Sequence, residues 1–282
     1  GKDVDSRLKD VENFWKTGKL LPNSNVQFGE GGAGTFSDGK LNTLVKDTSG
    51  RNKHVLQTFV EYGADSSILY DHKPHIGTDK LRDIIKRMRQ DIIKLGGTVL
   101  FESQMTDFHI KNNKITEICI NDTTWIETEL IVLAIGHSAR DTFEILYSKN
   151  IDMEPKAFAV GFRVMHPQSF INQSQYGTPE VKELGAAPYK ITAKASDGRG
   201  VYSFCMCPGG YVVNASSEDG FTAVNGMSYS GRNSSCANSA IIVSVSPEDY
   251  PSKEVLAGMH FQRILERNAF TIAQGKVPIQ KY

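Results

Sequence analysis

A dense run of glycines between Gly29 and Gly39 is the part of the sequence best suited to ligand chemistry. The run reads GEGGAGTFSDG, and Thr35, Ser37 and Lys40 lie within it or directly after it. Exposed backbone amides, hydroxyl groups and a cation together suit a phosphate-bearing or polar planar ligand. A plain surface loop, in which the glycines only serve turns, is the alternative.

The same run matches two nucleotide-binding motifs, and neither match is complete. Residues 29–34 fit Gly-x-Gly-x-x-Gly, but that motif needs a helix after it, and TFSDGK is typical of a loop. Residues 34–40 fit Gly-x-x-x-x-Gly-Lys, but Leu41 stands where the Mg²⁺-binding hydroxyl belongs. Asp38 would also bring a negative charge beside the phosphate. We therefore expect neither a standard Rossmann turn nor an NTPase loop.

A second candidate lies at the end of a continuous apolar run. The run LIVLAIG at residues 130–136 is typical of a central strand buried on both faces. Ser138 and Asp141 form the Ser-x-x-Asp pattern that caps a helix, so a strand is predicted to lead into a helix here. Open α/β sheets bind ligands at such a junction. Gly136 and His137 are therefore candidate contacts, with a tight turn and an ordinary loop histidine as the alternatives.

Two arginines and two cysteines complete the candidates for chemistry. Arg163 and Arg232 could hold an anionic substrate, although a surface or salt-bridged role is the alternative for each. Cys205 and Cys207 share one face of a predicted strand. Cysteines at i and i+2 are poorly placed for a relaxed disulfide, so we expect free core thiols.

The histidine pair His72 and His75 has a spacing that could bind a metal. Pro74 prevents a helical display of the two rings, and no further ligands cluster nearby in the sequence. We expect no metal site.

The elements that must position these residues indicate a mixed α/β (α+β) protein. Apolar periodicity predicts helices over 1–22, 51–63, 78–95 and 253–273, with a short helix after Ser138. Residues 98–102 are predicted to be a strand, and Asn112-Asn113 to join a β-hairpin. Residues 23–50 form a long irregular segment. Further strands are predicted at AFAVGFRV, GVYSFCM, GYVVNAS and AIIVSVS, with residues 208–210 joining the middle two as a hairpin.

The composition limits the classes of function. The 282 residues carry 32 Lys+Arg and 32 Asp+Glu, so the formal net charge is zero, and a nucleic-acid partner is not expected. No apolar run approaches the roughly 20 residues that span a bilayer, so no membrane partner is expected either. Four cysteines in this length do not make a disulfide scaffold, which favours a cytoplasmic location.

Four long sequence blocks resemble the bacterial family of largely uncharacterised FAD-dependent (NAD(FAD)-utilising) dehydrogenases, within the glutathione-reductase-like flavoprotein superfamily. The resemblance runs across nearly the whole chain. The blocks are NVQFGEGGAGTFSDGKLNT, LIVLAIGHSARDTFEILY, AFAVGFRVMHPQSFINQSQYG and CMCPGGYVVNASSEDG followed by NGMSYSGRNSSCANSAIIVSV.

The resemblance implies three segments for FAD and one region for the substrate. Residues 1–150 would be a partial, Rossmann-like FAD-binding domain, 151–252 a β-rich substrate domain, and 253–282 a C-terminal helix and return segment. The implied FAD contacts are Gly31, Gly32, Ala33, Gly34, Thr35, Ser37, Met105, Gly136 and His137. The candidate substrate contacts are Arg163, Gln173, Gln175, Tyr176, Arg232 and Asn233, and the catalytic candidates are His137, Arg163 and Arg232.

The chain departs from the family pattern because the N-terminal Gly-x-Gly-x-x-Gly unit and the C-terminal Gly-rich segment are missing. We therefore expect an internal fragment that binds FAD weakly or not at all and is inactive alone. The expected function of the intact protein is hydride transfer through FAD to or from a small-molecule substrate, with NAD(P)H as a candidate donor. The alternative is a non-enzymatic module that binds a small molecule or a protein.

Overall fold

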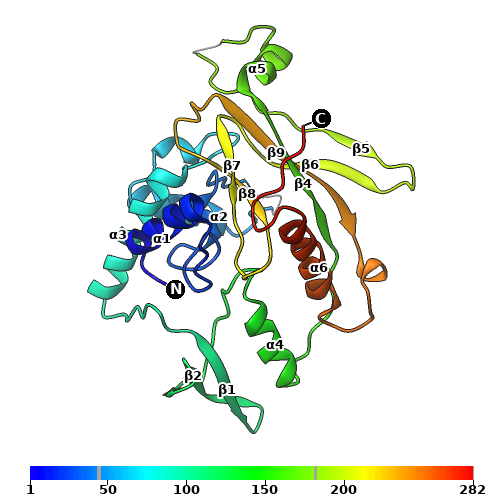
Figure 1. Cartoon of the computed structure of the whole chain (residues 1–282). Helices are drawn as coiled ribbons and strands as arrows, with labels where there is room; N and C mark the ends of the chain where they lie inside the picture. The colour runs from blue at the N-terminus through cyan, green and yellow to red at the C-terminus, as the bar shows by residue number, and fades with distance from the viewer. Residues whose placement is uncertain (43–45, 181–182, 282) are drawn as a thin grey trace.

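The helices of the first hundred residues pack together on one side of the molecule, and strands β4 to β9 build the other side (Figure 1). This computed structural model describes residues 1–42, 46–180 and 183–281. Residues 43–45 of the predicted irregular segment lie outside the described residues. The helices are α1 (Val4–Thr17), α2 (Arg51–Glu61), α3 (Thr78–Lys94), α4 (Arg140–Ser148), α5 (Gln168–Tyr176) and α6 (Ala257–Ile272), with 3₁₀ turns η1 (Ala33–Phe36), η2 (Ser66–Leu69) and η3 (Pro247–Asp249).

Three sheets accompany these helices, and every strand pair among the described residues runs antiparallel. The strand orders are β1-β2-β3, β4-β9-β6-β5 and β7-β8. The combination of helices and sheets confirms the mixed α/β class. The strands are β1 (Met105–Lys111), β2 (Lys114–Ile120), β3 (Thr124–Glu127), β4 (Phe158–Pro167), β5 (Thr192–Lys194), β6 (Gly200–Cys207), β7 (Gly210–Asn214), β8 (Val224–Ser228) and β9 (Cys236–Val245).

Local signals predicted α3 and the first hairpin well. Helix α3 buries Leu81 and Ile84, and Gly96 follows it with φ +91, as expected for a glycine that ends a helix. Asn112 and Asn113 both have positive φ between β1 and β2, which is the conformation of a type I′ turn. Both predictions are confirmed because the governing residues are adjacent in the sequence.

Helix α1 ends earlier than predicted. Gly18 adopts φ +76 and donates its backbone N–H to the Phe14 carbonyl at 2.7 Å, so the helix ends at Thr17 and not at Pro22. Helix α6 begins at Ala257, four residues after the predicted start at Lys253. Helix α5 and strands β3, β5 and β8 are not predicted from the sequence, because they are short or carry little apolar periodicity.

The prediction of two strands at 98–102 and 130–136 is wrong. Residues 97–104 and 128–139 are all described, and none of them lies in a strand. Leu130 and Val132 are 77% and 83% exposed. An apolar run forms a buried strand only when neighbouring strands cover it, and the described strands pair elsewhere. Ser138 is not the N-cap of α4, which begins after Ala139; its hydroxyl instead lies 3.1 Å from the His137 ring.

The predicted hairpin through residues 208–210 is also wrong. Strand β6 pairs with β5 and β9, whereas β7 leaves that sheet and pairs with β8. Gly209 has φ +52 at the turn between β6 and β7, and its backbone N–H is held by the Gln168 side chain at 2.8 Å. This turn therefore redirects the chain from one sheet to another.

An ion-pair network joins α4 to the C-terminal part of the fold. The Arg140 side chain, 7% exposed, lies 2.6 Å from both Glu218 and Glu266. Because a guanidinium presents a fixed set of donors, one arginine can bind both carboxylates. The network fixes the beginning of α4, and therefore the segment that carries Gly136 and His137.

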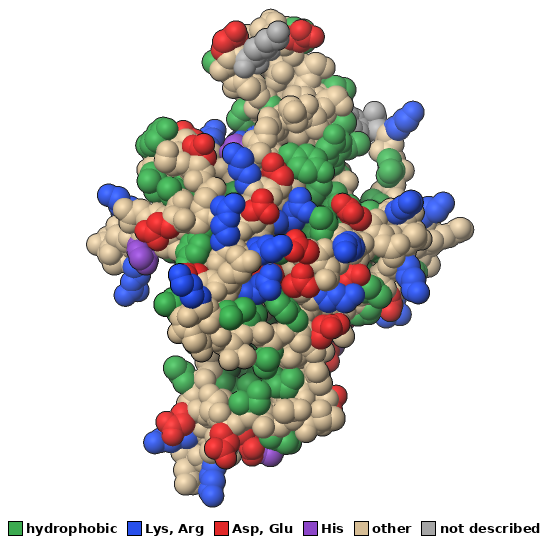
Figure 2. All heavy atoms as spheres, turned by 90° about the vertical axis from the view of Figure 1, so that its left-hand side faces the viewer, with side chains coloured by type: hydrophobic (Ala, Val, Ile, Leu, Met, Phe, Trp, Pro, Cys, Tyr) green, Lys and Arg blue, Asp and Glu red, His purple; other side chains and the backbone are tan. Residues whose placement is uncertain are grey.

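The distribution of charged side chains on the surface agrees with the formal net charge of zero. Figure 2 shows acidic and basic side chains intermingled across the middle of one face, and hydrophobic side chains gathered below them, at the height of β1, β2 and α4. The exposed apolar residues include Trp125, Leu130 and Val132. Within the described parts of the chain, no helix has both the length and the apolar character needed to cross a membrane.

Candidate functional site

The glycine run is a loop that a buried arginine of α1 holds in place. The Arg7 side chain is fully buried and donates to the carbonyls of Asn25, Val26 and Glu30 at 2.8, 2.8 and 2.7 Å. Gly29 permits this contact, because a Cβ at that position would lie 2.4 Å from the Arg7 side chain. Arg7 therefore fixes the entrance of the loop.

Substituting Arg7 with lysine tests this role. We expect Arg7→Lys to lower the free energy of unfolding by about 3 kcal/mol, because one ammonium cannot satisfy three buried carbonyls that diverge around a guanidinium. Arg51→Lys, at the exposed start of α2, is the control and should leave stability nearly unchanged. Equal urea midpoints for the two variants would show that Arg7 does not anchor the loop.

The central part of the loop offers open backbone. Gly31 and Gly34 are exposed, and no atom lies within 4 Å of the position that a Cβ of Gly32 would take. The 3₁₀ turn η1 follows, so the first amides of that turn lack acceptors within it. Thr35 is buried and its hydroxyl has no hydrogen-bond partner among the described residues. This arrangement fits a planar or phosphate-bearing group along Gly31 to Gly34. The Thr35 hydroxyl lies against Gly31, where a Cβ would come within 2.1 Å of it.

The end of the loop meets β8 at a buried carboxylate. Asp38 is 1% exposed, and the Arg232 guanidinium donates to both of its oxygens. Ser228 donates a hydroxyl hydrogen bond to the same carboxylate, and the Lys40 ammonium lies 3.2 Å from it. The Lys40 ammonium also lies 3.8 Å from the Cys207 sulfur, and Cys207 and Arg163 both donate to the Cys205 carbonyl, which brings Arg163 and its acceptor Asn238 beside these residues. The group is called the Asp38 cluster below and consists of Asp38, Lys40, Arg163, Ser228, Arg232 and Asn238. Lys40, Arg163 and Arg232 outnumber Asp38, so the cluster carries net positive charge.

The protonation of Asp38 follows from these contacts. Burial by itself raises the pKa of Asp38, but the Arg232 hydrogen bonds and the charges of Lys40 and Arg232 outweigh it, so the pKa lies below its usual value. Arg163, on β4, donates to Asn238 on β9 and to the Cys205 carbonyl at 3.2 and 3.3 Å. Both predicted substrate arginines therefore lie in one cluster, and each is bound to protein acceptors.

A second contact encloses the segment that carries Arg232. Asp79, at the start of α3, accepts hydrogen bonds from the backbone and hydroxyl of Ser230 at 2.8 and 2.7 Å. The His75 ring lies 3.1 Å from the Ser230 carbonyl, and burial lowers the pKa of His75. A Cβ at Gly77 would lie 2.3 Å from the Ser230 backbone. The segment after β8 is thus held between the glycine loop and the start of α3.

Hydrogen bonds connect the three segments that are implied to contact FAD. The first two residues of the chain bond to the glycine loop and to the segment before Met105, and that segment in turn contacts the start of α4. The Lys2 carbonyl accepts a hydrogen bond from Glu30 at 3.0 Å, and the Gly1 carbonyl accepts one from Glu102 at 2.7 Å. Gln104, next to Met105, is 2.5 Å from Asp141 at the start of α4, shortly after Gly136 and His137. His137 is exposed, and its ring lies 3.1 Å from the Ser138 hydroxyl; among the described residues, no hydrogen bond or ion pair connects it with the Asp38 cluster.

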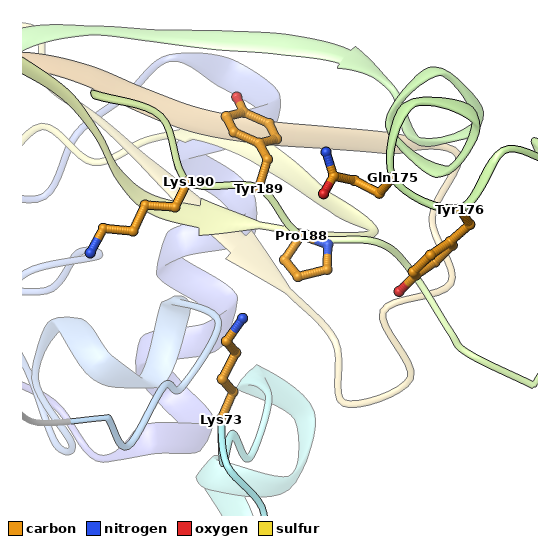
Figure 3. Close-up of a pocket in the computed structure, with 6 residues that line it drawn as sticks. All are labelled: Lys73, Gln175, Tyr176, Pro188, Tyr189 and Lys190. Carbon is orange, nitrogen blue, oxygen red and sulfur yellow. The ribbon is translucent and has the colours of Figure 1, made fainter. Parts of the chain in front are cut away.

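The other predicted substrate residues do not join the cluster. Gln173 is exposed and bonds the Gly177 carbonyl, and Asn233 is exposed on the segment after β8. Gln175 and Tyr176, at the end of α5, line a cavity of about 280 Å³. Figure 3 shows these two side chains with Lys73, Pro188, Tyr189 and Lys190, which complete the lining. None of the residues that line this cavity belongs to the Asp38 cluster.

Sequence reasoning missed the central residue of the cluster. The sequence indicates Asp38 only as an unfavourable neighbour of a phosphate, and nothing in it connects Asp38 with Arg232, 194 positions later. Ser228 lies in a strand that the apolar pattern did not predict. In the part of the chain that the structure describes, no group of three or more His, Cys, Asp or Glu side chains could hold a metal ion.

Two comparisons with known proteins bear on the family of this chain. Residues 157–282 match the family described as FAD-dependent protein, C-terminal domain-like. The chain is 50% identical over 284 residues to an uncharacterized protein of Clostridium beijerinckii, in an alignment that covers 99% of this chain and 53% of that protein. The chain therefore spans about half the length of this curated relative. The family match supports an FAD-dependent family and a flavoprotein-related function.

Proposed function

We propose that this chain forms part of an FAD-dependent oxidoreductase that transfers a hydride between a small-molecule substrate and the flavin. The match of residues 157–282 to an FAD-dependent family carries the proposal. When bound, FAD supplies the hydride acceptor, and the protein supplies binding, orientation and electrostatics. The resemblance to FAD-dependent dehydrogenases makes this proposal more specific: the oxidoreductase is a dehydrogenase.

The glycine loop is the proposed wall of the flavin site. Gly31, Gly32, Ala33 and Gly34 present backbone that a planar group can approach closely, and Arg7 keeps that backbone in one conformation. Thr35 and Ser37 are proposed to support the loop. Met105, Gly136 and His137 are proposed to contact the cofactor from the two neighbouring segments.

The Asp38 cluster is the proposed electrostatic part of the site. Its net positive charge favours an anionic substrate group or negative charge that develops nearby. Arg163 and Arg232 are proposed to contribute a positive charge at a fixed position, because Asn238 and Asp38 hold their guanidinium groups. Neither residue is assigned a proton transfer.

We further propose that these 282 residues bind FAD weakly or not at all when isolated. The runs at 97–104 and 128–136 are described throughout, and they neither form strands nor cover their apolar side chains. A dinucleotide site built at strand ends needs those strands to be formed. In the relative, which is about twice as long as this chain, we propose that the unaligned part supplies strands that pair with the corresponding runs.

Anaerobic reduction of the full-length relative tests the oxidoreductase proposal. We expect the purified protein to show the visible bands of a bound flavin, and NADH or NADPH to bleach them if a nicotinamide is the donor. Bleaching by dithionite alone would retain a flavoprotein but exclude both nicotinamides as donors. A flavin-free protein that stays colourless after FAD addition would contradict the proposal and favour a non-enzymatic binding module.

A further inference from the structure

Strand β6 contains a bulge at its two cysteines. Its pairing with β9 is regular up to Phe204 and resumes at Cys207, so Cys205 and Met206 together lie opposite Ser239. Cys205 has φ +48, a conformation that non-glycine residues seldom adopt. Bulges re-aim side chains and occur frequently beside active sites. The position of the two thiols is therefore set by a local distortion of the strand.

The core holds this bulge in place. Met206 is 7% exposed and packs with Ile171 of α5 and with Ala237 of β9. Cys207 is fully buried, whereas Cys205 is partly exposed. The two cysteines thus differ in access: a reagent from solvent meets Cys205 first.

The surroundings of the cysteines are polar and positively charged. The Cys207 thiol donates a hydrogen bond to the Cys205 carbonyl at 3.4 Å, and the Lys40 ammonium lies 3.8 Å from the Cys207 sulfur. Arg163 donates to that carbonyl as well. The glycine loop therefore contributes a cation directly to the cysteine pair.

These contacts separate the acidities of the two thiols. The neighbouring Cys207 thiol lowers the pKa of Cys205, as do the charges of Lys40 and Arg163, and together they outweigh burial, which raises it. The pKa of Cys207 is raised by the neighbouring Cys205 thiol and by burial, which outweigh the charge of Lys40. A partly exposed thiol of lowered pKa beside a buried thiol of raised pKa is the arrangement expected of a nucleophilic and a resolving cysteine.

We propose that Cys205 and Cys207 form a redox-active dithiol that exchanges with disulfides, with Cys205 as the nucleophile and Cys207 as the resolving thiol. The inference rests on the unequal exposure of the two thiols and on the bulge, which takes Cys205 out of the regular strand geometry that places i and i+2 cysteines poorly for a disulfide. It does not depend on the proposed flavin function. Its substrate class is a disulfide small or exposed enough to reach Cys205.

The exchange balances without any further reactant. The Cys205 thiolate, having lost its proton to solvent, attacks one sulfur of a disulfide R–S–S–R; that S–S bond breaks, and the first RS⁻ leaves and takes up a proton. Cys207 then attacks the Cys205 sulfur of the mixed disulfide, losing its proton to the second departing RS⁻. The products are an internal Cys205–Cys207 disulfide and two RSH, so the dithiol is oxidised and the substrate disulfide is reduced.

Oxidation of this chain with glutathione disulfide, followed by mass spectrometry of intact protein and peptides, tests the inference. We expect the wild type to lose the mass of two hydrogen atoms in the peptide that holds both cysteines, reversibly with dithiothreitol. Cys207→Ser should instead accumulate one glutathione on Cys205, and Cys205→Ser should remain unmodified in this peptide. Cys236→Ser is the matched control and should behave as the wild type.

The contribution of Lys40 is measured by the pH dependence of alkylation at Cys205. We expect Lys40→Gln to move the midpoint of iodoacetamide reactivity upward by about one pH unit, while Lys194→Gln on β5 leaves it unchanged. Far-UV circular dichroism verifies that each variant is folded. A folded wild type that forms no internal disulfide, or that reacts faster at Cys236 than at Cys205, would overturn the inference.

Discussion

Asp38→Asn is expected to lower the free energy of unfolding by about 3–5 kcal/mol. The carboxylate is almost completely buried, and its removal leaves the Arg232 guanidinium without its charged partner. Asparagine keeps the size of the side chain, so the loss reports charge and hydrogen bonding and not a cavity. Urea unfolding followed by tryptophan fluorescence measures the difference.

The control for this prediction is an exposed pair of the same kind. Asp107 lies 2.7 Å from Lys149, and both side chains are about one-third exposed, so Asp107→Asn should cost less than about 1 kcal/mol. If the two variants lose equal stability, the Asp38 cluster is not the electrostatic centre that the structure indicates.

Asp38 should also make the stability depend on pH in the acid range. Because its folded pKa lies below the unfolded value, its contribution is fully present above the unfolded pKa of about 4. The contribution is lost as the pH falls through the folded pKa. As the pH falls below 5, the wild type should therefore lose more stability than Asp38→Asn, which urea melts at several pH values measure.

Gly209→Ala is expected to have the second large effect, a loss on the order of 4 kcal/mol. Gly209 has φ +52, and a Cβ there would lie 1.8 Å from the Arg232 carbonyl oxygen. The alanine must therefore push away the segment that brings Arg232 to Asp38. A thermal or urea melt measures the change.

Gly198→Ala is the control that separates the cost of backbone strain from the cost of the steric clash at Gly209. Gly198 has φ +86 in the connection between β5 and β6, and its Cβ would meet no atom within 4 Å. Its substitution therefore introduces only the strain of a left-handed conformation, about 1–2 kcal/mol. Similar losses in both variants would mean that the contact between Gly209 and Arg232 contributes little.

The features that sequence predicted correctly are governed by neighbouring residues. Asn112-Asn113 determined the first hairpin, and Gly96 determined the end of α3. The features that sequence missed depend on distant residues. The run at 130–136 has the composition of a buried strand, but no described strand pairs with it.

In the candidate site, too, residue types could be predicted from the sequence, but contacts between distant residues could not. Arg163 and Arg232 were predicted from their residue type, and the structure places both in the Asp38 cluster. Their acceptors could not be predicted, because Asp38 approaches Arg232 only after the glycine loop packs against β8. Cys205 and Cys207 were expected as free core thiols, and both are free; the bulge that distinguishes them has no sequence signature.

An FAD titration of this chain and of the full-length relative, followed by visible absorbance after removal of unbound flavin, tests the central claim most directly. We expect flavin bands in the relative, and weak or no bands in the 282-residue chain, because the apolar runs at 98–102 and 130–136 do not form strands in it. Bands of equal strength in both would mean that the glycine loop and its neighbours suffice for binding. No bands in either protein at saturating FAD would contradict the flavin assignment.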